Sequence, residues 1–136
     1  LSQFNGKVVF EGIIDCSEKC LANGIPVGLG TDTGCPFITH YDMWRELVYF
    51  HKYCGVSNKF ALYTATKRNA EIAHIDDITG TVEPGKCADL IVTEKNPIDD
   101  LTALRDVKMV MARGKLIREP KVKKYENVER ELDKFL

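Results

Sequence analysis

The chain has 136 residues, of which 19 are Lys or Arg and 20 are Asp or Glu, so its formal net charge is -1. This balance offers no electrostatic reason to bind nucleic acid or an acidic membrane surface, and we expect neither as a partner. A hydrophobic share of 44% and a charged share of 29% exclude a disordered chain and indicate one globular domain. No apolar run is long enough to span a membrane.

The cysteines are odd in number: Cys16, Cys20, Cys35, Cys54 and Cys87. This count argues against a disulfide framework and favours a reducing compartment, so we expect a cytoplasmic protein. Cys16 and Cys20 lie four residues apart on a predicted helix. They could form a metal or redox pair, or they could serve as small core residues.

Residues 8–23 predict a helix because their apolar side chains recur at helical spacing. Asn23 and Gly24 are typical of a helix end. Residues 25–30 are short, apolar and rich in glycine, which predicts a buried strand. A helix followed at once by a strand is half of an α/β unit, and Asp32 falls in the polar turn just beyond that strand.

Two further helices are predicted between residues 42 and 75. Asp42 is expected to cap the first, which ends at Gly55, and Ser57 to cap the second. His74 is expected in the last turn of the second helix, where a cation is favourable.

From residue 78 onward, short β-rich runs are separated by Gly and Pro. Residues 88–93 predict one strand, and residues 107–117 predict a hairpin that turns at Arg113 and Gly114. Strands grouped after helices indicate a separate β layer in a mixed α/β fold.

The tail, residues 121–136, predicts a surface helix packed on the body or on a partner chain. Its apolar residues fall on one helical stripe: Val122, Tyr125, Val128, Leu132 and Phe135.

Asp32 is the acidic residue whose position in the sequence most clearly indicates a catalytic or metal-binding role. Active sites of parallel α/β proteins form at the carboxyl ends of strands. A carboxylate held there can bind a divalent cation or take a proton from metal-bound water. The alternative is an Asx-turn, in which the side chain accepts hydrogen bonds from nearby backbone N–H groups.

Four motifs follow one another along residues 7–117. They are VGLGTDTG at 27–34, NKFALYTATKRNA at 58–70, GTVEPGKCADLIV at 80–92, and NPIDDL at 96–101 together with residues 110–116. In this order they resemble the metal-dependent amidohydrolases. Residues 40–47 are most similar to the imidazolonepropionase-like and prolidase-like branch of that family.

The resemblance implies that residues 1–77 are the last βα units of a TIM-barrel hydrolase domain. Residues 78–118 would be strands of the terminal β-sandwich, and residues 119–136 a C-terminal amphipathic helix. A complete barrel needs about 250 residues, so most of the barrel would lie outside this chain.

The resemblance also implies a reaction: hydrolysis of a C–N bond in an amide, a cyclic amide or a dipeptide by metal-activated water, usually with zinc. Asp32 would be both a metal ligand and the catalytic group that carries a proton from the water to the leaving amine. His40 lies on the loop after the same strand, where it would contact the small-molecule or peptide substrate or simply pack within the loop.

In that family the other metal ligands are a His-x-His pair after the first barrel strand, a Lys or Glu after the fourth, and two His from the fifth and sixth. These upstream ligands have no counterpart here. The sequence has no His-x-His, and His40, His51 and His74 all follow Asp32. Catalytic zinc normally needs at least three protein ligands, so we expect the isolated chain to be inactive. The start at Leu1, without an initiator Met, indicates a truncated or proteolysed product.

Two other hypotheses remain. A lone strand at residues 25–30 would have open edges that invite pairing with a second copy, so the alternative function is a non-catalytic, self-associating structural or binding module. A homo-oligomer is expected in either case. The third hypothesis is a thiol-based redox or metal-sensing domain that uses Cys16 and Cys20.

Overall fold

The structure is a computed structural model and describes residues 5–136; the first four residues of the predicted barrel part lie outside that range. The helices are α1 (Gly6–Ala22), α2 (Met43–Cys54), α3 (Asn58–Tyr63), a π-helical turn (Thr64–Arg68), α4 (Asn69–Ile72) and α5 (Glu126–Leu132). The strands are β1 (Leu90–Thr93), β2 (Val107–Ala112) and β3 (Lys115–Arg118), and short 3-10 helices cover Leu101–Arg105 and Asp133–Phe135. The predicted mixed α/β class is confirmed.

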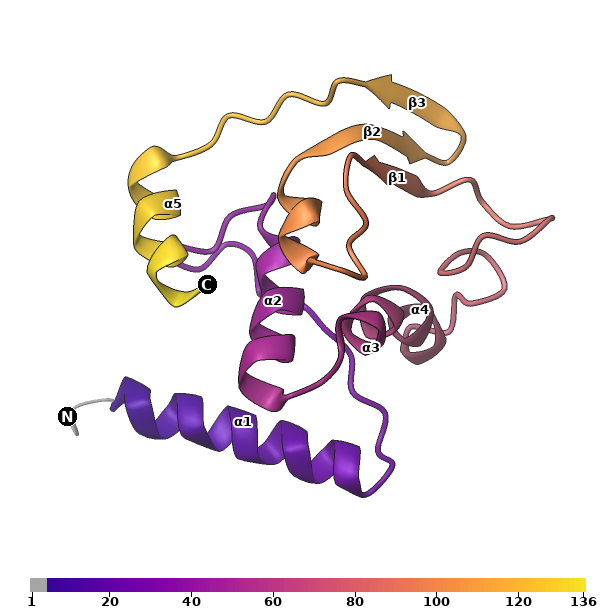
Figure 1. Ribbon diagram of the computed structural model, residues 1–136. Coiled ribbons are helices and arrows are strands. Elements are labelled where there is room, and N and C mark those ends of the chain that lie inside the picture. Colours follow the sequence, from indigo (N-terminus) through magenta and orange to yellow (C-terminus); the bar gives the residue numbers. More distant parts are fainter. Residues whose placement is uncertain (1–4) are drawn as a thin grey trace.

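Helix α2 lies at the centre of the molecule (Figure 1). Helix α1 passes its carboxyl-terminal end, α5 lies on one side, and α3, α4 and the sheet lie on the other. The buried core gathers around α2 and consists of Trp44, Leu47, Val48, Phe50, Ala61 and Leu101. Its position follows from the apolar side chains that recur at helical spacing along this helix.

Helix α1 forms as predicted, with the Asn5 side chain accepting hydrogen bonds from the backbone N–H groups of Lys7 and Val8. Its contact with α2 includes the rings of Phe10 and Tyr53, which meet edge to face with centroids 5.0 Å apart. None of its side chains is buried, and Ile13 is 58% exposed. The apolar stripe read from the sequence is therefore present but mostly uncovered.

The predicted helices between residues 42 and 75 are also confirmed. Helix α2 ends at Gly55, which has a left-handed φ of 67°. Ser57 caps helix α3 as predicted, and its hydroxyl accepts from the backbone N–H of Phe60 at 3.1 Å. The π-helical turn joins α3 directly to α4, so the second helix runs through to Ile72.

The sheet is an antiparallel meander in the order β1-β2-β3. Ile91 pairs with Val110, which pairs in turn with Ile117. The hairpin between β2 and β3 turns at Arg113 and Gly114 as predicted, with φ values of 48° and 77°. Two successive positive φ values give a turn whose twist matches that of the flanking strands.

The predicted strand at residues 25–30 is wrong. These residues run as an irregular segment, and Ile25 is 54% exposed. An isolated strand leaves its backbone groups without ladder partners, and no strand of residues 5–136 lies beside this segment.

The prediction for the tail is corrected as well. The helix begins at Glu126, not at residue 121, and the stripe residues Tyr125 and Phe135 are more than half exposed. The side chain buried deepest on α5 is instead Glu129, at 7% exposure. A carboxylate can lie there because two arginines contact it.

Two predictions about helix ends fail for local reasons. Asp42 occupies the N-cap position of α2, but its carboxylate caps no backbone N–H; it accepts from the Thr39 hydroxyl and pairs with Arg45 instead. His74 lies beyond α4 with a φ of 56°, in the left-handed conformation that ends a helix.

Candidate functional site

The irregular segment that leads to Asp32 is held by one side chain of α4. Asn69 donates its amide N–H to the carbonyl of Leu29 at 2.8 Å and accepts from the backbone N–H of Leu29 at 2.9 Å. These two bonds replace the ladder that a neighbouring strand would supply. A Cβ at Gly28 would lie 2.8 Å from the Asn69 oxygen, so glycine is needed for this close approach.

Asp32 follows at the carboxyl end of this segment and is exposed. Its φ of 50° is left-handed, a conformation that Asp tolerates better than most residues. The Cys35 thiol donates to its carboxylate at 3.7 Å. Within residues 5–136 no backbone N–H donates to that carboxylate, so the Asx-turn alternative is not formed, and the exposed carboxylate has only the weak thiol contact within those residues.

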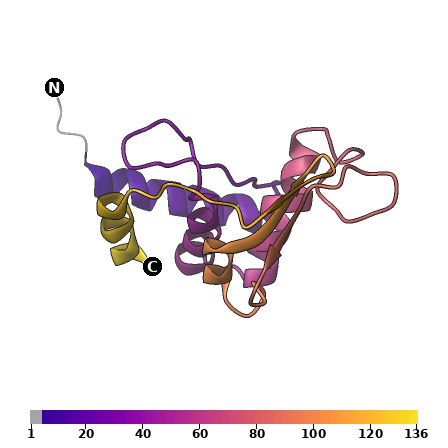
Figure 2. The same ribbon diagram turned by 90° about the horizontal axis from the view of Figure 1, so that it is seen from above.

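His40 lies on the loop that follows, and it is also exposed. Figure 2 shows this loop, in purple, projecting from the body of the molecule. Near the carboxyl-terminal end of the loop, the Thr39 hydroxyl donates to the Asp42 carboxylate at 2.6 Å, and that carboxylate pairs with Arg45 of α2. Among the described residues, no hydrogen bond joins the His40 side chain to Asp32.

The donor set supports one ligand of a metal site and not a complete site. Within residues 5–136, no three His, Cys, Asp or Glu side chains are grouped so that they could hold a metal ion. Asp32 offers an accessible carboxylate, an oxygen ligand that zinc accepts. Within the described residues, Asp32 is therefore a candidate for a single ligand.

A cluster of buried charges lies where the sequence predicted none. The Arg45 guanidinium, 2% exposed, lies 3.0 Å from the Glu129 carboxylate and 2.8 Å from that of Asp133. Arg105 contacts the same two acids at 3.0 and 2.9 Å. Burial opposes the charge on Arg45, but its hydrogen bond to Asp133 and the other nearby carboxylates outweigh burial and raise the pKa of the guanidinium.

Glu46 is a second charged residue in an unexpected place. It lies on the wall of an apolar groove of about 340 Å³ between α1, α2 and residues 27–30. Burial raises the pKa of its carboxyl group. The sequence pattern of α2 did not predict that Arg45 or Glu46 would be buried. Contacts with segments far away in the chain decide which charged side chains of a helix are buried.

A sequence profile of the Amidohydrolase family matches residues 10–117. The chain belongs to the Amidohydrolase family. The resemblance read from the four motifs is therefore confirmed. None of the helices within residues 5–136 is long and apolar enough to cross a membrane.

Relatives of this amidohydrolase chain come from the branch that the sequence indicated. It is 43% identical over 88 residues to the imidazolonepropionase of Picrophilus torridus, a match that covers 65% of this chain and 21% of the relative. A candidate prolidase from Bifidobacterium longum superposes with a TM-score of 0.86 at 39% identity, covering 89% of this chain and 30% of that one. A Xaa-Pro dipeptidase solved with bound methionine superposes with a TM-score of 0.71 at 35% identity, covering 78% of this chain and 25% of that one.

The amidohydrolase chain thus spans about a fifth of the curated relative and a quarter to a third of these solved relatives.

Proposed function

We propose that this chain is the C-terminal portion of a metal-dependent amidohydrolase that hydrolyses the C–N bond of an amide, a cyclic amide or a dipeptide. The observation that carries the proposal is the family match over residues 10–117, which contains Asp32 with an accessible carboxylate. The proposal includes the division into a barrel part, residues 1–77, a β-sandwich part, residues 78–118, and the C-terminal segment.

Asp32 would serve as one ligand of the metal, for which we propose zinc, and as the group that carries a proton. When bound, the metal would make water nucleophilic at neutral pH. The Asp32 carboxylate would accept the proton of that water and deliver it to the leaving amine. The Asn69 contacts with Leu29 support this role, because they fix the backbone three residues before Asp32.

His40 would contact the substrate from the loop after Asp32. Its exposure and its place on this projecting loop leave the imidazole free to bind an amide or peptide. An imidazole there can donate or accept one hydrogen bond, which would orient the substrate and not take part in bond breaking.

A chimera tests the proposal. This chain would replace the matching part of the Bifidobacterium longum candidate prolidase, and zinc-dependent hydrolysis of Xaa-Pro dipeptides would be measured against the parent protein. We expect an active chimera, loss of activity with Asp32→Asn, and retained activity with Asp76→Asn, an exposed acid outside the site. An inactive chimera beside an active parent contradicts the function, and an active Asp32→Asn chimera contradicts the role of Asp32.

The isolated 136-residue chain would be inactive, because it offers one candidate ligand where catalytic zinc needs at least three. Zinc-dependent hydrolysis by the pure chain, lost on Asp32→Asn, would refute this point.

A second candidate function, a self-associating module, is favoured by the uncovered apolar side chains of α1. Val8 and Ile13 are 61% and 58% exposed. Exposed apolar patches of this kind mark interaction surfaces. Light scattering on the pure chain should give a multiple of the 15.3 kDa chain mass if copies associate through them. A mass of one chain would contradict the self-association and the expected homo-oligomer.

A further inference from the structure

Helix α5 lies against the carboxyl-terminal end of the loop that carries His40, although the two are more than 80 residues apart in sequence (Figure 1). The backbone N–H of Tyr125, at the start of α5, donates to the Tyr41 hydroxyl at 2.9 Å. This contact joins α5 to the residue next to His40.

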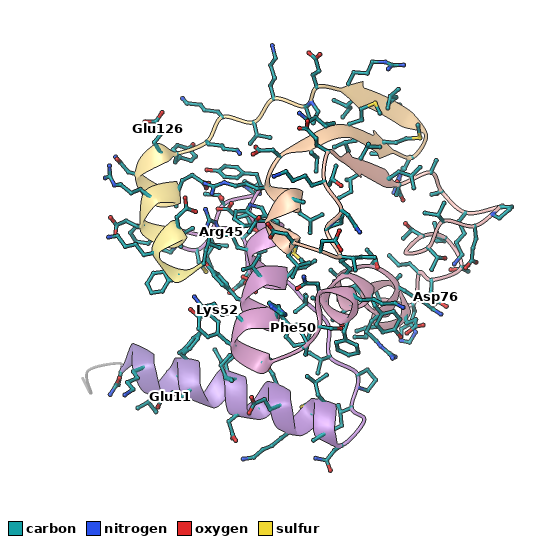
Figure 3. The ribbon with its side chains drawn as sticks, viewed as in Figure 1. Glu11, Arg45, Phe50, Lys52, Asp76 and Glu126 are labelled. Carbon is teal, nitrogen blue, oxygen red and sulfur yellow. The ribbon has the colours of Figure 1, made fainter. Side chains whose placement is uncertain are left out.

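A buried relay of charges makes a second connection. The Arg45 side chain points from the top of α2 toward α5 in Figure 3. Its Nη2 meets Glu129 and Asp133 on the α5 side, at 3.0 and 2.8 Å. Its Nε meets Asp42 on the loop side at 3.4 Å, and the Asp42 carboxylate accepts from the Thr39 hydroxyl at 2.6 Å. The contacts run without a break from α5 to the residue before His40.

Other contacts fix α5 along α2. Arg105 binds the same two acids, and the guanidinium groups of Arg45 and Arg105 lie 4.5 and 5.4 Å from the centre of the Trp44 ring. At the far end, Lys52 and Tyr53 donate to the backbone oxygen of Phe135 at 3.0 and 3.2 Å. The segment 126–135 is therefore attached to α2 near both ends of that helix.

Removal of the Glu129 and Asp133 carboxylates would affect the loop because it leaves the charge of Arg45 unbalanced. Arg45 is 2% exposed and cannot be solvated in place, so the loss of Glu129 and Asp133 leaves a buried cation with Asp42 as its remaining partner. A guanidinium that moves outward to find water would take Asp42 with it or leave that carboxylate unpaired. A carboxylate that moves with Arg45 breaks its hydrogen bond with the Thr39 hydroxyl, and one left unpaired and buried is destabilised. Either outcome weakens the attachment of the loop.

We propose that α5 is a strap that holds the loop of residues 31–42 in place, with Glu129 and Asp133 as positioning residues that act through Arg45 and Asp42. The functional importance of this strap rests on the proposed function, because the loop carries Asp32 and His40. It assigns the C-terminal segment a part in shaping the site.

Amide hydrogen exchange on the complete 136-residue chain tests the strap. The reporters are the backbone N–H groups of Ile38 and Asp42, which donate to the carbonyls of Cys35 and Thr39. In the double variant Glu129→Gln/Asp133→Asn, we expect these amides to exchange about tenfold faster, because charge-assisted hydrogen bonds are lost at the other end of the relay. Amides of the β2–β3 hairpin should keep their rates.

The matched control is Glu131→Gln, which removes an acid from the same helix. Within residues 5–136, the ion pair of Glu131 is with the exposed Lys134. It should leave the loop amides unchanged. Faster exchange in α5 with unchanged loop amides would overturn the proposal, as would an equal acceleration at every site.

If the double variant does not fold, the single variant Asp133→Asn decides the question, since it removes one acid from the relay and leaves Glu129 in contact with Arg45 and Arg105. Faster exchange of the Asp42 amide supports the strap, and an unchanged rate overturns it. Exchange does not depend on hydrolysis, so a failure of the strap is distinguishable from a failure of the proposed activity.

Discussion

Replacement of Asn69 by alanine should loosen the segment that carries Asp32. The Asn69 amide forms two hydrogen bonds with one peptide unit, at 2.8 Å to the Leu29 carbonyl and 2.9 Å from the Leu29 N–H. Asn69→Ala removes both bonds while leaving the backbone of α4 intact. No other side chain among the described residues bonds the Leu29 backbone.

The magnitude follows from the two lost bonds. Each contributes about 1 kcal/mol, so the pair contributes about 2 kcal/mol to the free energy of unfolding. Alanine favours the helix over asparagine by about 0.6 kcal/mol, which offsets part of the loss. Asn127→Ala on α5 is the matched control, because among residues 5–136 the hydrogen bond of the Asn127 side chain is an exposed one, accepted from Arg130 at 3.3 Å. The difference between the two variants isolates the hydrogen bonds and should be about 2 kcal/mol.

Urea denaturation under reducing conditions measures both variants. The single tryptophan, Trp44, is 5% exposed in the folded chain, so its fluorescence reports unfolding of the core around α2. We expect a lower midpoint for Asn69→Ala at an unchanged slope. Equal midpoints for Asn69→Ala and Asn127→Ala would show that Asn69 does not stabilise residues 27–30, and the reasoning on the site would fail.

Two further predictions concern the β half of the chain. Gly80→Ala should destabilise the fold by about 3 kcal/mol in the same assay, because the new Cβ would lie 2.5 Å from that of Ala70 at a φ of 93°. Gly85→Ala has the same backbone strain at φ 91° but open space, so it should cost clearly less, and equal losses would contradict the steric argument. Asp89 accepts from the backbone N–H of Arg113 at 2.7 Å, which holds the pKa of this carboxyl group below its ordinary value. A lowered folded pKa contributes stability above the unfolded pKa of about 3.9 that is lost as the pH falls through the folded value. Asp89→Asn should therefore be less stable than the parent at pH 7 and approach it as the pH falls below about 4, whereas a pH-independent difference would contradict the linkage.

Local signals predicted the helices and the hairpin well. The glycine after α2, the serine before α3 and the pair Arg113-Gly114 act through their own backbone geometry, so their effect is readable without knowledge of the rest of the fold. The antiparallel sheet follows from the same kind of evidence, since its second and third strands are joined by that short turn.

The strand at residues 25–30 shows where local signals stop. Its apolar composition suits a buried strand, but a strand forms only when a neighbouring strand supplies hydrogen-bond partners. Within residues 5–136, the Asn69 side chain bonds the Leu29 backbone instead. The tail shows the same limit in reverse: the apolar stripe predicted a buried face, while the buried face holds Glu129 because Arg45 and Arg105 lie opposite it.

The candidate site also has features that local sequence predicts and features that depend on distant contacts. The place of Asp32 after an apolar run, and the motifs around it, are local properties, and they predicted the family that the profile confirms. The partners of its supporting residues could not be read in this way. Asn69 meets Leu29 across 40 residues, and Arg45 meets Glu129 across 84.

The sequence by itself determined the family, the order of helices and strands, and the position of Asp32 at the end of an apolar segment. These features depend on backbone propensities and on motifs that span a few neighbouring residues. Only the tertiary structure decided which charges are buried, which side chain replaces a missing strand, and which helix supports the loop beside Asp32. Those outcomes depend on contacts between segments far apart in the chain, where a charge is stable in the interior only because an opposite charge arrives from elsewhere.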